Sequence, residues 1–89
     1  MVITAELSLY PLEKDYEESI IHFIRKLKEN DGVEVMTHAM STFVKGESKQ
    51  VFAAIEQAMA EVDNRSVTFS LVIKAINRSL PVEQGFLSF

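Results

Sequence analysis

Hydroxyl side chains lie beside aromatic and apolar residues at two places in the sequence. The first is Ser8–Leu12, S-L-Y-P-L, and the second is Met40–Glu47, M-S-T-F-V-K-G-E, in which Ser41 and Thr42 are adjacent. A buried hydroxyl group needs a hydrogen-bond partner. Each hydroxyl can simply be bonded locally within a strand. Taken together with Thr37, they can also line a small pocket with polar ends.

Three aromatic residues are candidates for the flat apolar walls of such a pocket, namely Tyr10, Phe43 and Phe52. Small heterocycles are usually held between walls of this kind, with a few polar groups that fix their orientation. These residues therefore offer a possible binding site for a small ring compound.

Catalytic and metal-binding patterns are not found. His22 and His38 are the only histidines, they lie far apart, and there is no cysteine. Glu17 and Glu18 resemble paired carboxylates, but adjacent positions on a helix diverge by about 100°. No phosphate loop, zinc-protease motif or nucleophile elbow occurs. We expect no active site, no metal and no cofactor.

The composition is that of one small globular domain. The 89 residues are 47% apolar and 25% charged, which suits a single hydrophobic core. Nine basic residues are scattered among thirteen acidic ones, for a net charge of −4, so nucleic-acid binding is disfavoured. Without a long apolar run, a signal peptide or cysteine, we expect a cytoplasmic protein that does not enter membranes.

Hydrophobic periodicity predicts the elements of the first half of the chain. Residues 2–10 alternate as a half-buried strand does, and Pro11 closes it. A helix follows, with Asp15 as N-cap, Glu18 as its capping-box partner and a left-handed stop at residues 30–32. Residues 33–45 indicate two short strands joined near Ala39 and Met40, although a single bent strand is the alternative.

The second half predicts a helix that begins at Glu47–Ser48, then a strand over residues 67–76. The apolar stripe of this helix comprises Val51, Phe52, Ile55, Met59 and Val62. Residues 77–89 indicate an irregular C-terminal tail, which divides the chain into a domain at 1–76 and the tail.

This order of elements, βαββαβ, predicts an α+β ferredoxin-like fold, in which two helices cover one face of a four-stranded antiparallel sheet. The other face, called the open face below, is expected to be too apolar for water. We therefore expect copies to associate through it as a homodimer or homotetramer. The residues predicted on this face are Val2, Thr4, Glu6, Ser8, Tyr10, Met36, Met40, Phe43, Val72 and Ile76.

The two motifs quoted above, Ser8–Leu12 and Met40–Glu47 followed by Val51-Phe52, together with the element order, resemble the thiamine-binding YkoF-like family over residues 2–76. The resemblance implies a non-enzymatic protein that binds thiamine or its hydroxymethylpyrimidine part. Some members carry two such domains, and a single-domain chain would recover that arrangement by dimerising.

The family motifs carry over Ser8, Tyr10, Ser41 and Thr42 as ligand-binding candidates, and the strand and helix patterns add Thr37 and Phe52. Glu6 or Glu47 would suit a thiazolium cation. A regulatory or oligomerisation module that binds a protein partner and no small molecule is the alternative. An enzyme is a more distant third possibility, because no catalytic constellation is found.

Overall fold

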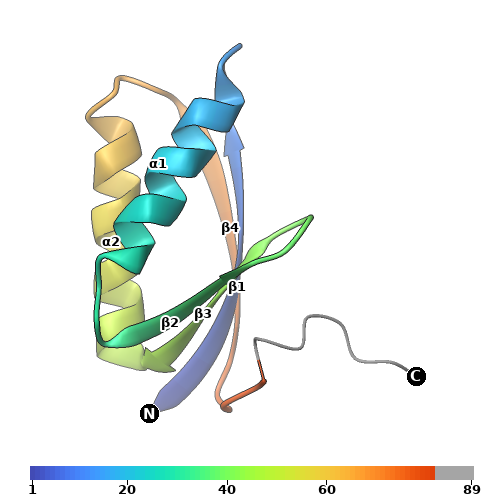
Figure 1. Ribbon diagram of the computed structural model, residues 1–89, viewed down its shortest axis with the longest axis vertical. Helices are drawn as coiled ribbons and strands as arrows, with labels where there is room; N and C mark the ends of the chain where they lie inside the picture. The colour runs from blue at the N-terminus through green and yellow to red at the C-terminus, as the bar shows by residue number, and fades with distance from the viewer. Residues whose placement is uncertain (82–89) are drawn as a thin grey trace.

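The computed structural model of the protein, which describes residues 1–81, has the predicted βαββαβ order (Figure 1). Its elements are β1 (Val2–Pro11), α1 (Tyr16–Lys28), β2 (Val33–Thr37), β3 (Thr42–Glu47), α2 (Ser48–Asp63) and β4 (Phe69–Ile76). All pairings in the sheet are antiparallel, and the strand order is β2-β3-β1-β4. The fold is therefore the α+β ferredoxin-like fold.

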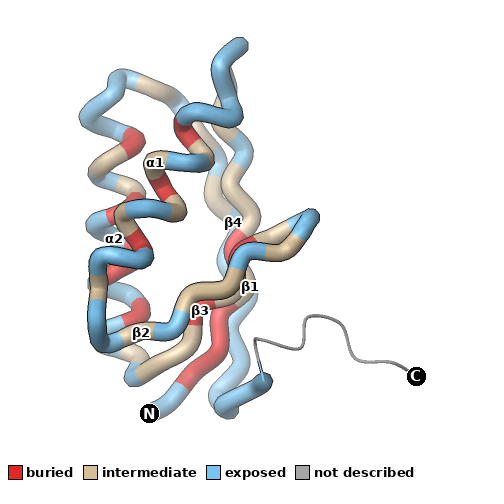
Figure 2. Tube along the Cα trace, viewed as in Figure 1, coloured by how far each residue is buried: buried red, intermediate tan, exposed pale blue. Residues whose placement is uncertain are grey.

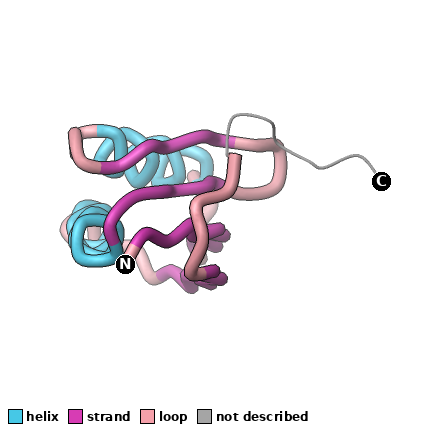
Figure 3. Tube along the Cα trace, turned by 90° about the horizontal axis from the view of Figure 1, so that it is seen from below, coloured by secondary structure: helices cyan, strands magenta, loops and turns pink. Residues whose placement is uncertain are grey.

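Both helices lie on one side of the sheet, as the view from below shows (Figure 3). The core lies between these layers, where burial concentrates on β1 and on the inner faces of the helices (Figure 2). Alternation places every second side chain of β1 in this core. The buried apolar residues are Ile3, Ala5, Leu7, Phe23, Leu27, Val44, Val51, Ala54, Ile55, Ala58 and Val62.

Residues 33–47 form two strands, so the alternative of a single bent strand is excluded. The turn between them consists of Ala39 and Met40, and the His38 N–H donates to the Ser41 carbonyl oxygen at 2.8 Å. Neither turn residue has a positive φ, which explains why the sequence lacks the Asn-Gly signal of a primed turn.

The predicted ends of α1 are wrong in detail. Asp15 is at the N-cap position but its side chain makes no capping hydrogen bond. Glu18, its expected capping partner, instead pairs with Arg65 at 3.6 Å. At the other end, Glu29 is a right-handed cap and Gly32 has no left-handed φ. The Asn30 side chain bonds the last helical carbonyls, which makes a left-handed stop unnecessary.

The predicted stripe of α2 is also wrong at one residue. Phe52 is 48% exposed, whereas its neighbour Val51 is fully buried. The small residues Ala54 and Ala58 are buried and let the helix lie close to the sheet and α1. A position next to a buried stripe residue points about 100° away from it, and Phe52 therefore faces outward.

The segment after β4 crosses the open face. Thr4 points away from the helices, yet it is only 4% exposed, because its hydroxyl group donates to the Arg78 carbonyl at 2.8 Å and accepts from the Leu80 N–H at 2.9 Å. Lys45 Nζ also donates to the Leu80 carbonyl oxygen, at 3.0 Å. We call residues 78–80 the strap. The predicted tail from residue 82 onward lies outside the described residues.

Candidate functional site

A notch separates β1 from the β2–β3 hairpin at the end of the sheet nearest the hairpin turn. The pairing of β1 with β3 stops at Leu7 and Thr42, whereas the pairing of β1 with β4 continues to Pro11 and Phe69. Beyond Leu7, β1 therefore has a neighbouring strand on one side only. The gap on the other side has a volume of about 140 Å³.

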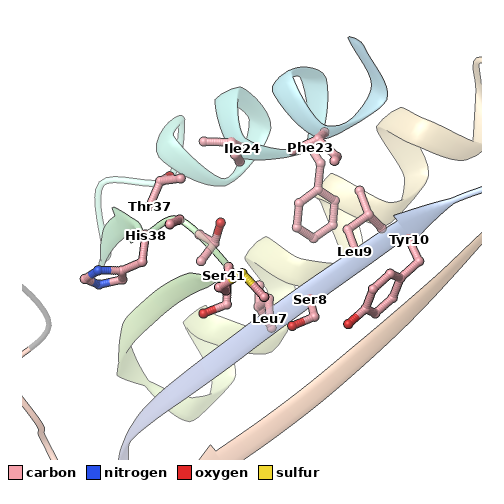
Figure 4. A pocket seen from close by; sticks show the side chains of 13 residues that line it. Leu7, Ser8, Leu9, Tyr10, Phe23, Ile24, Thr37, His38 and Ser41 are labelled. Carbon is pink, nitrogen blue, oxygen red and sulfur yellow. The ribbon is translucent and has the colours of Figure 1, made fainter. Parts of the chain in front are cut away.

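Five of the six predicted site residues line this notch: Ser8, Tyr10, Thr37, Ser41 and Thr42. They come from β1, the end of β2, and the segment from Ser41 to the first residue of β3, Thr42, which meet around the hairpin turn (Figure 4). Phe52 does not line it. It lies on the outward side of α2, so its assignment to the site is not supported by its position.

The other two aromatic residues that were predicted to form pocket walls, Tyr10 and Phe43, lie in two different hollows. Tyr10 lines the notch, whereas Phe43 lies on the open face, in a second hollow bordered by Glu6, Lys74 and Leu80. Phe43 instead packs against His38, with ring centroids 4.7 Å apart. In Figure 4 the His38 ring points away from β1, so the imidazole is turned from the interior of the notch.

The adjacent side chains of Ser41 and Thr42 point to opposite faces of the sheet. The Ser41 hydroxyl donates to the Glu6 carboxylate on the open face at 3.3 Å, and that carboxylate also lies 3.6 Å from Lys74 Nζ. Thr42 has the parity of the buried Val44, faces the helices and is buried. Its hydroxyl takes part in none of the side-chain hydrogen bonds found among residues 1–81, which leaves it available to a ligand.

Apolar residues that the sequence assigned only to the core complete the notch. Leu7 and Leu9 of β1, with Ile20, Phe23 and Ile24 of α1, close its helix side. In Figure 4, Leu9 and Phe23 lie between β1 and α1, whereas Ser8 and Tyr10 lie on the opposite side of the strand. The notch thus opens through the plane of the sheet, with an apolar inner wall and a polar outer margin.

The backbone of Leu9 borders the notch as well. In an antiparallel ladder, residues alternately exchange both hydrogen bonds with one neighbour and then with the other. Leu12 donates to Thr68, across from β4, so even-numbered residues of β1 direct their backbone groups to β4. The Met1 carbonyl accepts from Ser48 after β3, so odd-numbered residues face β3. Leu9 is odd, and β3 does not extend to meet it.

The comparisons with known proteins agree with this architecture. A family model described as the YKOF-related family matches residues 2–76. This chain therefore belongs to the YKOF-related family. No curated protein matches it.

Solved structures share the fold across almost the whole chain. A hypothetical protein from Methanocaldococcus jannascii is 27% identical, with a TM-score of 0.70, and the match covers 93% of this chain and 90% of that one. A domain of unknown function from Bacillus cereus is 19% identical, with a TM-score of 0.77 and coverage of 96% and 86%. A candidate thiamine biosynthesis or salvage protein from Thermotoga maritima is 17% identical, with a TM-score of 0.70 and coverage of 94% of both chains.

Proposed function

We propose that this protein is a cytoplasmic, non-enzymatic binder of thiamine or of its hydroxymethylpyrimidine part, and that the notch is the binding site. The observation that carries the proposal is the combination, in one gap, of a free strand edge, an available Thr42 hydroxyl and an apolar wall. Membership of the YKOF-related family supports it, as does the link of the Thermotoga maritima protein to thiamine.

The size of the notch argues for the pyrimidine rather than the whole vitamin. Pockets that enclose drug-sized ligands usually measure roughly 300–1,000 Å³, and the notch measures about 140 Å³. It suits one ring. The thiazolium ring of thiamine would then lie outside, where the Tyr10 side chain is 56% exposed. The Glu6 carboxylate on the same face would exchange its partner Lys74, at 3.6 Å, for the cation. An aromatic face and an acid both favour a cation.

The lining of the notch supports binding without turnover. Apart from Tyr10, its one titratable side chain is His38, which is turned toward Phe43. No cluster of three metal-ligating residues occurs in the part of the chain that the structure describes. A general base needs to reach the reacting group within hydrogen-bond distance. The His38 imidazole, whose Nε2 atom is buried without a hydrogen-bond partner, packs against Phe43 instead of facing the gap.

The binding proposal is tested by calorimetric titration of the protein with hydroxymethylpyrimidine and with thiamine. We expect saturable binding of one ligand per chain. Thr42→Val removes the hydroxyl group but keeps the branched shape, so the dissociation constant should rise about tenfold without loss of fold.

Phe52→Ala is the control, because it changes a predicted site residue that lies outside the notch. Its affinity should equal that of the unmodified protein. Absence of heat and of thermal stabilisation with both compounds would refute the binding proposal. It would leave the alternative of a regulatory or oligomerisation module with a protein partner.

We further propose that the protein is a homodimer or homotetramer assembled through the open face. Val72 and Ile76 expose apolar surface there, and scattered exposed apolar residues alone would mean little. Four charged side chains on this face, however, are already paired: Lys74 with Glu6 and Lys45 with Glu34, each at 3.6 Å. A face whose charges are neutralised in advance costs less to bury against an identical copy.

A further inference from the structure

We propose that the backbone N–H and C=O of Leu9 select the ligand, by binding the edge of a 4-aminopyrimidine with two hydrogen bonds. This inference rests on the proposed function and specifies which ligand atoms the site recognises. The ring nitrogen N3 would accept from the Leu9 N–H, and the neighbouring 4-amino group would donate to the Leu9 carbonyl oxygen. The ring would thus occupy the place of the missing β3 residue.

The register of the sheet shows which backbone groups of β1 lack a strand partner and can therefore bind a ligand. Leu7 is paired with Thr42, and the next position of β1 that faces this side is Leu9. A strand partner for Leu9 would be residue 40, but Met40 belongs to the turn. Among the described residues, therefore, no strand continues the ladder at Leu9. A buried or half-buried backbone donor and acceptor normally find partners, and a ligand can supply them.

The geometry also suits a flat ring. The N–H and C=O of one extended residue point to the same side, as a hydrogen-bonded strand pair requires. A ring bound to both lies in the plane of the sheet. Its two faces would then contact the two walls of the notch, Phe23 with Ile24 on the helix side and Tyr10 on the outer side. Figure 4 shows Phe23 and Tyr10 on opposite sides of β1.

Ligand analogues test the ligand atoms in the unmodified protein. One analogue of hydroxymethylpyrimidine lacks the 4-amino group, and the other carries C–H in place of N3. Each loses one of the two bonds and leaves a backbone group unpaired, so we expect each to bind at least about tenfold more weakly than the parent compound. Equal affinity for all three compounds would overturn the inference.

Leu9→Pro tests the role of the Leu9 backbone N–H group. Proline lacks the N–H, and this N–H is not used by the sheet, so the substitution is tolerated as at an edge strand. We expect weaker binding of hydroxymethylpyrimidine by about tenfold and no further weakening for the N3-to-C–H analogue, whose partner is already absent. Leu9→Ala, which keeps the N–H, is the matched control and should retain this difference between the two compounds.

The outcomes separate the two proposals. If the unmodified protein binds neither thiamine nor hydroxymethylpyrimidine, the proposed function fails. If it binds hydroxymethylpyrimidine but does not distinguish the analogues, the function stands and the role of Leu9 is refuted. If Leu9→Pro does not fold, as circular dichroism would reveal, the analogue series decides the question by itself.

Discussion

Gly32 precedes β2 and Gly46 lies near the end of β3, so the two glycines are close together at the open end of the hairpin. Both lie in crowded places, but they contribute differently to stability. A Cβ atom added to Gly46 would lie 2.9 Å from the backbone carbonyl oxygen of Gly32 and 3.4 Å from Val33 Cγ1. A Cβ atom added to Gly32 would meet the Gln50 Oε1 atom at 2.0 Å. The first obstacle is the backbone just before Val33, which cannot move easily because Gly46 pairs with both Val33 and Ile3. The second is the end of a flexible side chain.

We therefore expect Gly46→Ala to lower the free energy of unfolding by about 1–3 kcal/mol, as overpacking does. Gly32→Ala should change it by less than about 1 kcal/mol, because Gln50 can rotate away and alanine restricts the unfolded chain. Urea denaturation of the two variants measures both values. Similar losses for the two would contradict the distinction between backbone and side-chain obstacles.

The outer surfaces of α1 and α2 are joined by a charged network around Arg65. Its Nη1 atom lies 3.1 Å from His22 Nε2, and its Nη2 atom lies 3.6 Å from the Glu18 carboxylate. The other ring nitrogen of His22 lies 3.8 Å from Glu61. Because a guanidinium group can only donate, His22 Nε2 must accept, which identifies the histidine as a structural link between the helices.

Removing the centre of this network with Arg65→Met should lower stability by about 0.5–1 kcal/mol, since the pairs are partly exposed. The loss should shrink in 1 M salt, where the Debye length falls to about 3 Å. Arg25→Met is the control: this residue is in the same helix as His22 and makes no ion pair with any of residues 1–81. A salt-independent loss at Arg65 would point to packing instead.

At the level of elements, much of the fold could be predicted from the sequence. The alternation of residues 2–10 and the stripes of the helices depend on local periodicity, which a single sequence displays directly. The position of Phe52 could not be predicted as reliably, because it borders a buried stripe and only packing decides which neighbour faces inward. The capping box failed for a related reason: Arg65, far along the chain, competes for Glu18.

The grouping of residues around the candidate site could be predicted in part. Ser8, Tyr10, Thr37, Ser41 and Thr42 share a notch because their motifs flank the ends of adjacent strands, and strand ends are visible in sequence. The sequence does not reveal that the backbone of Leu9 lacks a partner strand, because this depends on how far β3 extends beside β1. The burial of Thr4 likewise depends on the strap, which carries no periodic signal.

At the scale of the whole molecule, the two sides of the protein present different apolar surfaces. Val72 on β4 is 54% exposed on the open face, and Ile21 on α1 is 46% exposed on the helix side. No helix of the described chain is long and apolar enough to cross a membrane. The open face joins Val72 to other exposed apolar residues of the sheet, whereas Ile21 lies beside the charged residues of α1.

We expect Val72→Asp to convert the assembly into monomers, because a symmetric interface would bury the new carboxylate twice. Ile21→Asp introduces the same charge at a similar exposure on the other side and should leave the assembly intact. Sedimentation velocity of both variants distinguishes them. A monomeric unmodified protein, or equal behaviour of the variants, would contradict assembly through the open face.

The late start of β3, at Thr42, has a consequence for how this fold can gain or lose a ligand site. The notch exists because the hairpin turns at Ala39 and Met40, one hydrogen-bonded pair short of Leu9. Two extra residues on each side of that turn would place a strand residue opposite Leu9, with the alternation of side chains preserved. The notch would then be filled by the chain itself. The length of the hairpin, rather than the identity of any one side chain, determines whether β1 keeps an unpaired edge that a ligand can bind.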